Sequence, residues 1–416
     1  MKTSFFTHNR KRLAEKLPNQ SLTILFAGEA PVSSADQLYA FVPNRNFYYI
    51  TGIDQPKPIM LLAKTNNAIE EFLFIEKADP VLEKWIGKRM TKEEAQEASG
   101  ISGIHFLEDF ETQLAKILSS GKIESLYLDL EKREWNSAST PAHQFAREIQ
   151  SRYPSVAIRN VYSEICEMRI FKTEEEVERI KEAIRITQDG IRNLMRNARP
   201  GMTENQLEAY FDFTLKTNGV KHHAFHTICA SGQNGTVLHY EDNDALVEDG
   251  SLVLLDLGAQ YEYYNADISH TFPVNGSFTE KQKLYYNIVL KALRETTAII
   301  KPGLKFTALN EHTKKVLSEG LIEAGLIEKP EEISKYYYHG VSHYLGLDTH
   351  DVGIYKDRVL EPGMVLTVEP GLYIEEEGIG IRIEDDVLVT EDGHENLSAD
   401  LIREVEELET FLKEER

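Results

Sequence analysis

The sequence predicts two domains: an α/β domain over residues 1–168 and a second domain of helices and strands over residues 173–416. Three observations predict this division. Short β-rich runs alternate with helical stretches up to about residue 165, and a boundary falls near Arg169–Lys172. Directly after that boundary, Thr173 and Glu176 form a T-x-x-E capping box at the start of a long helix.

In the first domain, local composition predicts each element. Runs rich in β-branched and aromatic residues predict strands at SLTILFAG (21–28), FYYITGI (47–53), KPIMLLAK (57–64) and EEFLFIEK (70–77). TKEEAQEASG (91–100) and EDFETQLAKILSSG (108–121) predict helices, and SLYLDL (125–130) predicts a further strand. This alternation is typical of a self-contained α/β domain.

In the second domain, capping boxes mark three helix starts: Thr173 with Glu176, Thr203 with Gln206, and Thr279 with Gln282. We expect the second helix to stop at Asn218-Gly219 and the third before Pro302-Gly303. Strands are predicted over 251–258, 264–274, 364–374 and 379–390. The acidic tail EVEELETFLKEER (404–416) predicts a solvated terminal helix.

Charge and composition exclude several classes of partner. The formal net charge is −22, from 68 acidic and 46 basic residues, which argues against nucleic acid and anionic membrane. Cys166 and Cys229 have no metal-binding spacing and predict small buried side chains rather than a disulfide. No stretch approaches the ~20 apolar residues that span a bilayer, and the first residues lack a signal-peptide core. We therefore expect a cytoplasmic protein.

Asp256 lies inside the apolar run LVLLDL (252–257), where a buried, unpaired carboxylate would cost several kcal/mol or become neutral. Asp267 follows in the next predicted strand. A hairpin centred between Tyr261 and Glu262 would place the two aspartates directly opposite, with Cβ atoms roughly 4.5–5.5 Å apart. Two ionised carboxylates at that distance need a shared proton or a cation.

Two further carboxylates have comparable settings. Glu369 ends the apolar run in MVLTVEPGLYI (364–374). In GIGIRIEDDVLV (378–389), isoleucines alternate with polar residues, so that one strand face presents Arg382 and Glu384 side by side. Any one of these carboxylates has a simpler explanation as a salt-bridged residue at a strand end. Their recurrence in several strands favours a shared site.

Histidines cluster in HGVSHYLGLDTHDVG (339–353), which contains His339, His343 and His350. The spacing of the first two resembles H-E-x-x-H, but Gly340 occupies the glutamate position. The segment GVSH imitates only part of G-x-S-x-G. The run KHHAFH (221–226) offers an alternative metal cluster, although a place in the wall of a cleft explains it better.

Taken together, these motifs resemble the metal-dependent pita-bread peptidases: Xaa-Pro aminopeptidase (aminopeptidase P), prolidase and, more distantly, methionine aminopeptidase. The resemblance covers essentially the whole chain and is strongest in DLGAQYEYYNADISHTFPVNG, HGVSHYLGLDTHDVG, TVEPGLYI and GIGIRIEDDVLV. It implies an N-terminal α/β domain for oligomerisation and substrate access, followed by an α+β pita-bread catalytic domain. One departure is SHTF where TRTF is common in the family.

The resemblance implies a metal centre with five ligands: Asp256, Asp267, His343, Glu369 and Glu384. In the family, Asp267 and Glu384 would bridge two divalent cations, whose four positive charges balance the four carboxylates. An oxygen-rich shell with one imidazole suits Mn²⁺, with Co²⁺ or Zn²⁺ as alternatives.

The implied reaction is hydrolysis of the first peptide bond of small peptides whose second residue is proline. Glu369 would act as general base. His239, in TVLHYEDN, and His350 correspond to histidines that bind substrate and stabilise the intermediate. His339 and Arg382 correspond to further positions lining the site, although the first could instead support the fold and the second could only orient Glu384.

Two other functions stay open at this point. Prolidase, which acts on Xaa-Pro dipeptides, would use the same ligands. A non-catalytic pita-bread protein that binds peptides is disfavoured because all five ligand positions are intact. The segment SSADQLYAFVPNRNFYYITGI (33–53) resembles the family's N-terminal motif. By analogy it implies a homodimer or homotetramer in which this domain closes over a neighbouring subunit's site.

Overall fold

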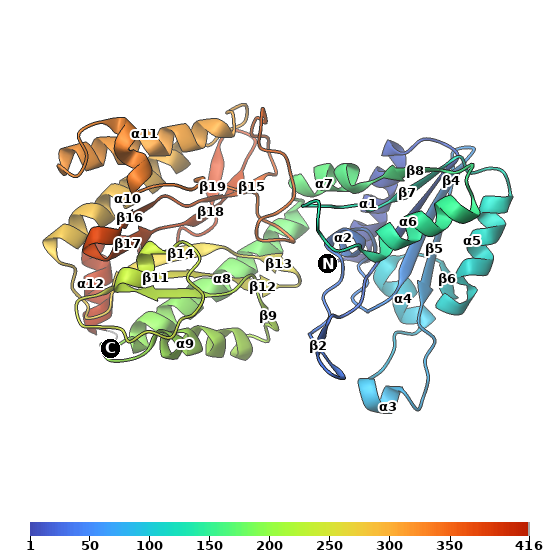
Figure 1. The fold of residues 1–416 in the computed structure, drawn as a ribbon, viewed down its shortest axis with the longest axis horizontal. Helices are drawn as coiled ribbons and strands as arrows, with labels where there is room; N and C mark the ends of the chain where they lie inside the picture. The colour runs from blue at the N-terminus through green and yellow to red at the C-terminus, as the bar shows by residue number, and fades with distance from the viewer. Residues whose placement is uncertain (415–416) are drawn as a thin grey trace. The chain divides into compact units, whose positions relative to one another are not determined.

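The computed structural model describes residues 1–414, and the chain divides into two compact units (Figure 1). The first unit is Met1–Arg169 and the second begins at Ile170. Among the described residues, no helix is both long and apolar enough to cross a bilayer. Cys166 and Cys229 are buried, as predicted.

The first unit is built on a six-stranded mixed sheet of order β6-β5-β4-β1-β7-β8. Its strands are β1 (Ser21–Phe26), β4 (Ile59–Thr65), β5 (Ala68–Ile75), β6 (Gly103–Phe106), β7 (Ser125–Leu128) and β8 (Ala157–Asn160), with a separate hairpin of β2 (Val32–Ser34) and β3 (Gln37–Leu38). Its helices are α1 (Thr3–Lys16), α2 (Arg45–Thr51), α3 (Glu83–Ile86), α4 (Lys92–Ser99), α5 (Phe110–Ser119), α6 (Pro141–Arg152) and α7 (Tyr162–Ile170). The predicted α/β class is confirmed.

The strand predicted over residues 47–53 is wrong, because this segment forms helix α2. Its aromatic and β-branched composition favours a strand, but the ends of the segment carry helix signals. The side chain of Asn44 accepts a hydrogen bond from the Phe47 amide at 2.8 Å, and Gly52 ends the helix with φ 71°. Phe47, Tyr49 and Ile50 are buried, so tertiary packing outweighs local propensity.

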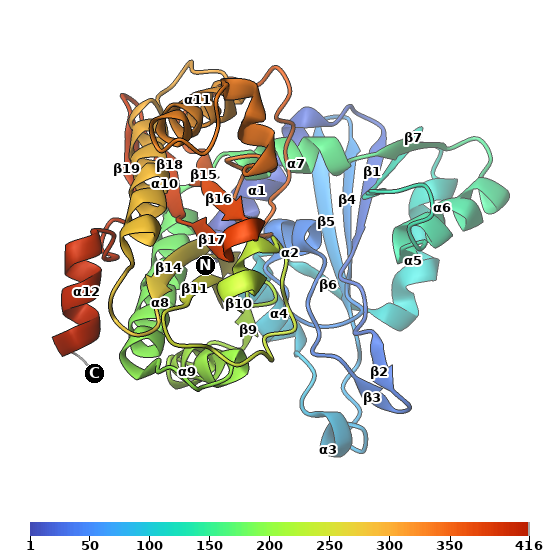
Figure 2. The ribbon, with the colours of Figure 1, turned by 60° about the vertical axis from the view of Figure 1, so that its left-hand side comes forward.

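The second unit packs strands between two pairs of helices (Figures 1 and 2). Helix α8 (Glu174–Asn197) packs on α9 (Glu204–Thr217), and α10 (Glu280–Ala298) packs on α11 (Thr307–Glu323), with α12 (Val405–Glu414) at the end. The strands are β9 (His222–His223), β10 (Ile228–Ser231), β11 (Leu252–Leu257), β12 (Ala259–Tyr261), β13 (Tyr264–Asn265), β14 (Ile268–Pro273), β15 (Val365–Val368), β16 (Gly371–Ile374), β17 (Ile379–Arg382), β18 (Asp385–Val389) and β19 (His394–Asn396).

The helix signals of the second unit are confirmed. Capping boxes are present at the starts of α8, α9 and α10, and Gly219 follows α9 with φ 73°. The predicted terminal helix is α12, although residues 415–416 of that prediction lie outside the described residues. It is amphipathic rather than wholly solvated, because it buries Val405, Leu408 and Leu412.

The predicted hairpin register is wrong by two residues. Strands β11 and β14 are antiparallel, and Asp256 lies opposite Ser269 rather than Asp267. The turn is at Glu262 and Tyr263, which have φ 46° and 73°. Both residues adopt the left-handed conformation without the Gly or Asn that usually marks such a turn, so local composition gave no signal for its position. Because the shift is even, Asp267 still faces the same side as Asp256.

A glycine contact joins β17 to the 3₁₀ helix η2 (Gly232–Thr236), and it yields a stability prediction. A Cβ at Gly380 would overlap the backbone of Gly235. We therefore expect Gly380→Ala to lower the free energy of unfolding by about 1–3 kcal/mol, measured by urea denaturation. Gly393→Ala is the matched control, because its Cβ would meet nothing within 4 Å. Equal effects of the two substitutions would contradict the close approach of β17 and η2.

Candidate metal centre

The predicted carboxylate ligands lie where strands begin or end. Asp256 is near the end of β11, and Asp267 directly precedes β14. Glu369 follows β15, and Glu384 lies between β17 and β18. The Glu384 amide donates a hydrogen bond of 3.0 Å to the Ser269 carbonyl, which ties this segment to β14. Strands far apart in the sequence thus position their carboxylates in one cluster.

Asp267, His343 and Glu384 form the centre of the cluster, with one potential ligand atom from each within 4.8 Å of the others. His343 Nε2 lies 3.4 Å from Asp267 Oδ2 and 3.5 Å from Glu369 Oε1. The Nδ1 atom of His343 lies 2.9 Å from the Tyr344 carbonyl, to which it donates. That hydrogen bond fixes the ring so that Nε2 faces the carboxylates, as in metal-binding histidines.

Asp256 is compensated in part by Arg382. Its Oδ2 accepts a hydrogen bond of 2.6 Å from Arg382 Nη2, whereas its buried Oδ1 has no hydrogen-bond partner. Arg382 Nε donates to Ser269 Oγ at 2.8 Å, and that hydroxyl donates to Glu384 Oε2 at 2.7 Å. Arg382 and Glu384 are therefore linked through Ser269, and one oxygen of Asp256 remains open for a ligand.

Sequence reasoning missed two residues of this cluster, Ser269 and Asp386. The Asp386 side chain is fully buried, and its Oδ2 accepts a hydrogen bond of 3.1 Å from the Asp267 amide. Its Oδ1 has no hydrogen-bond partner. The available signal was the two-residue period of a strand, which places Ser269 on the same face as Asp267 and Asp386 on the same face as Glu384.

Burial and mutual repulsion control the protonation of the cluster. Burial, followed by the charges of Asp256 and Asp386, raises the pKa of Asp267 well above its ordinary value. Burial and then the charge of Asp267 raise the pKa of Glu384 in the same way. Burial also raises the pKa of Glu369, although His343 and Arg382 oppose the shift. Without cations, the cluster therefore retains protons that a bound metal would displace.

His339 belongs to a hydrogen-bonded chain beside the carboxylates. Arg382 Nη1 donates to the Tyr373 hydroxyl at 3.0 Å, and that hydroxyl lies 2.9 Å from His339 Nε2. His339 Nδ1 lies 2.8 Å from the Gly340 carbonyl, so Nδ1 donates and Nε2 accepts. Burial lowers the pKa of His339 to about 4, which agrees with a neutral ring.

The remaining histidines have different surroundings. The His350 ring lies edge-on to His343, with centroids 4.4 Å apart. His239 is exposed on the segment that follows η2, and its charge contributes to lowering the pKa of His339. His223, in KHHAFH, pairs with Asp212 at 2.7 Å. Within the described part of the chain, the KHHAFH histidines are not part of the group of close ligand atoms.

The donor set fits divalent cations. The cluster contains five carboxylates, and the Arg382 guanidinium balances one of their charges. Four negative charges therefore remain when all five are ionised. The five are Asp256, Asp267, Glu369, Glu384 and Asp386. Open oxygens on Asp256 and Asp386 and the Nε2 atom of His343, which faces the carboxylates, are the atoms available to bind a metal. Oxygen-rich sites with an imidazole suit first-row divalent metals.

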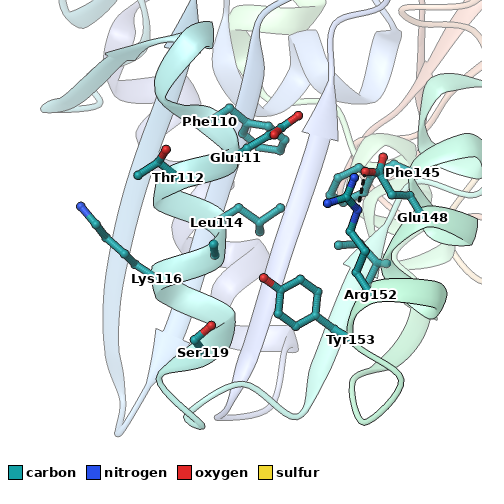
Figure 3. A pocket seen from close by; sticks show the side chains of 12 residues that line it. Phe110, Glu111, Thr112, Leu114, Lys116, Ser119, Phe145, Glu148, Arg152 and Tyr153 are labelled. Atoms are coloured by element: carbon teal, nitrogen blue, oxygen red, sulfur yellow. Dashed lines mark ion pairs between the residues drawn. The ribbon is translucent and has the colours of Figure 1, made fainter.

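Two cavities in the described part of the chain are lined by other residues. One of about 680 Å³ lies in the first unit between α5 and α6, where Phe110, Phe145 and Tyr153 line it beside the Glu148–Arg152 ion pair (Figure 3). Another, of about 510 Å³ in the second unit, includes Tyr373 in its wall and therefore adjoins the hydrogen-bonded chain described above.

Known proteins resemble the chain over nearly its whole length. Residues 178–391 match metallopeptidase family M24, and residues 6–127 match the aminopeptidase P N-terminal domain. An Xaa-Pro aminopeptidase of Escherichia coli (strain K12) is 35% identical, and the alignment covers 98% of this chain and 97% of the E. coli protein. A solved Bacillus anthracis protein, proposed to be an aminopeptidase P, is 64% identical with a TM-score of 0.99, covering 100% of this chain and 99% of its own. The E. coli aminopeptidase P solved with the inhibitor Pro-Leu is 34% identical with a TM-score of 0.92. This match covers 100% of this chain and 99% of the E. coli chain.

The raised carboxyl pKa values predict how the stability of the metal-free protein depends on pH. Asp267, Glu369 and Glu384 have folded-state pKa values above the ordinary 3.8 and 4.5, so the folded state binds more protons than the unfolded state above that range. Their contribution to stability is complete below the ordinary values and is lost as pH rises through the raised ones. We therefore expect the melting temperature of the metal-free protein to fall between about pH 5 and pH 8.

Scanning calorimetry with a chelator measures this dependence. The same series with saturating Mn²⁺ is the control, and we expect it to melt higher at neutral pH because the cations neutralise the carboxylates. A metal-free melting temperature that is flat or rises over this range would contradict the buried cluster.

Proposed function

The chain belongs to the aminopeptidase P family of M24 metallopeptidases, and from this premise we propose that it hydrolyses the first peptide bond of small peptides with proline in second place. It is a metallo-exopeptidase with the fold of that family, an N-terminal α/β domain and a pita-bread catalytic domain. The observation that carries the proposal is the buried cluster of Asp267, His343 and Glu384 in a chain that resembles Xaa-Pro aminopeptidases over its whole length.

We propose that two divalent cations bind at five ligands, with Asp267 and Glu384 shared between them: Asp256, Asp267, His343, Glu369 and Glu384. The four negative charges of the cluster and the open Oδ1 of Asp256 support this number. Mn²⁺ fits the oxygen-rich donors best, with Co²⁺ and Zn²⁺ as alternatives. When bound, the cations supply Lewis acidity toward the scissile carbonyl and lower the pKa of water.

Glu369 is proposed to act as general base, taking a proton from the attacking water and passing it to the leaving group. It lies 3.5 Å from His343 at the cluster, where its carboxylate can take up a proton from the attacking water. The leaving group is the nitrogen of proline, which carries no hydrogen in the peptide bond. It must therefore receive a proton to leave as a neutral amine, and the proton taken up by Glu369 is available for that step.

The other predicted residues are proposed to hold the substrate and the site. His350, packed on His343, and His239 are proposed to donate hydrogen bonds to the substrate and to the intermediate. His339 and Arg382 already form hydrogen bonds with Tyr373, and Arg382 also binds Asp256. We therefore propose that these two residues chiefly orient the groups they contact. The homodimeric or homotetrameric state and the cytoplasmic location stay predictions of the sequence.

Substrate length tests the proposed function. We expect Mn²⁺-loaded protein to cleave an Xaa-Pro-Xaa tripeptide at its first bond, and N-acetylation of the peptide to abolish cleavage. Mass spectrometry identifies the released residue. Cleavage of a Gly-Pro dipeptide without cleavage of the tripeptide would make the protein a prolidase. Failure to cleave either peptide with metal bound would contradict a peptidase function.

Asp267→Ala tests the proposed shared ligand. We expect metal content to fall from two ions per chain to one or none, measured by elemental analysis. Turnover should fall roughly a thousandfold, the equivalent of several kcal/mol of lost transition-state stabilisation. Asp212→Ala is the control, because Asp212 pairs with His223 outside the cluster. Full activity of Asp267→Ala with two metals bound would refute the assignment.

A further inference from the structure

Glu204 is a buried carboxylate that the proposed mechanism does not use. It occupies the first turn of α9, and its side chain is fully excluded from solvent. Five donors surround it. Its Oε1 accepts from the Ser231 amide at 2.6 Å, from Ser231 Oγ at 2.8 Å and from Asn234 Nδ2 at 3.1 Å. Its Oε2 accepts from the Tyr240 hydroxyl at 2.8 Å and from the Ala245 amide at 3.0 Å.

These five hydrogen bonds join segments that are otherwise separate. Ser231 ends β10, Asn234 lies in η2, and Tyr240 and Ala245 belong to the irregular segment 238–245. The Glu204 amide also donates to the Ala245 carbonyl at 3.0 Å. A short polar segment without secondary structure is thereby fixed to the start of α9, and hydrogen bonds to a buried charge are among the stronger ones in proteins.

A second contact fixes the middle of the same segment. Asn243 has φ 49°, and its Nδ2 donates to Glu208 Oε2 at 3.0 Å and to the Thr227 carbonyl at 2.8 Å. Its Oδ1 accepts from the Cys229 amide at 3.0 Å. Segment 238–245 is therefore held by α9 at one face and by β10 at the other.

The segment carries His239 between two anchored neighbours. Leu238 and Tyr240 pack against the apolar cluster that contains Ile228, Leu254 and Tyr373. Tyr373 is the residue that bonds Arg382 and His339 beside the carboxylates. His239 itself is exposed, and its charge contributes to lowering the pKa of His339. The position of its ring thus depends on how the two neighbours are held.

We infer that Glu204 is a positioning residue, which fixes segment 238–245 so that His239 is directed at the substrate beside the metal centre. The inference rests on the proposed function, because the role of His239 toward the substrate belongs to that proposal. The Tyr240 hydroxyl is suited to a donor role, since burial and the hydrogen bond to Glu204 raise the pKa of Tyr240 to about 12. Small errors in the placement of a side chain that binds substrate, as proposed for His239, can cost about a hundredfold in rate.

Glu204→Gln is the principal variant. The amide nitrogen of glutamine would present hydrogens either to the three donors that now bond Oε1 or to the two that bond Oε2. Either the Ser231 amide or the Ala245 amide therefore loses its acceptor. Tyr240→Phe removes one donor and keeps the ring that packs against the apolar cluster, and it carries the test if Glu204→Gln does not fold. Glu248→Gln is the control, because it makes the same change of charge on an exposed side chain.

Hydrogen exchange measures the anchoring without any substrate. We expect the amides of residues 238–245 to exchange at least about tenfold faster in Glu204→Gln, with unchanged exchange in β11 and β14 and unchanged metal content. Wild-type exchange rates in this segment would overturn the inference, even if the wild-type protein proved inactive toward every peptide.

A double-mutant cycle with His239→Ala tests whether Glu204 acts through that histidine. We expect kcat/KM for the tripeptide to fall roughly 10- to 100-fold in Glu204→Gln, and little further when His239→Ala is already present. Binding of Pro-Leu, measured by calorimetry, should weaken in the same non-additive way. Additive losses would overturn the inference, whereas an inactive wild-type protein would instead contradict the proposed function.

Discussion

Five carboxylates and the Arg382 guanidinium share one buried space at the ends of the strands of the second unit, and this electrostatic constraint governs the site. Buried carboxylates that face one another must hold protons or cations. The raised pKa values of Asp267, Glu384 and Glu369 follow from that constraint. The same crowding gives an affinity for divalent ions, because a cation removes both the desolvation cost and the repulsion at once.

The scaffold keeps the carboxylates together despite their repulsion. Antiparallel pairing of β11 with β14 and of β15 with β18 places strand ends side by side. Ser269 connects these ends, because its hydroxyl bonds both Arg382 and Glu384 and its carbonyl accepts from the Glu384 amide. Polar groups that bind no metal therefore determine where the ligands point, and Glu204 extends this arrangement to the segment that carries His239.

The sequence predicted much of this arrangement, and its failures have identifiable physical causes. Capping boxes placed α8, α9 and α10 because the signal is local. The hairpin register failed because Glu262 and Tyr263 adopt positive φ without the residues that usually permit it. Helix α2 was misread because its burial, not its composition, decides its form. Asp386 and Glu204 escaped notice because their importance arises from contacts with residues distant in the sequence.

Titration of the metal-free protein with Mn²⁺ tests the central claim most directly. Calorimetry at one pH, in two buffers of different ionisation enthalpy, counts the metals bound and the protons released together. If buried carboxylates hold protons until cations replace them, two ions should bind per chain with net release of protons. Binding without proton release, or fewer than two ions bound per chain, would contradict the account.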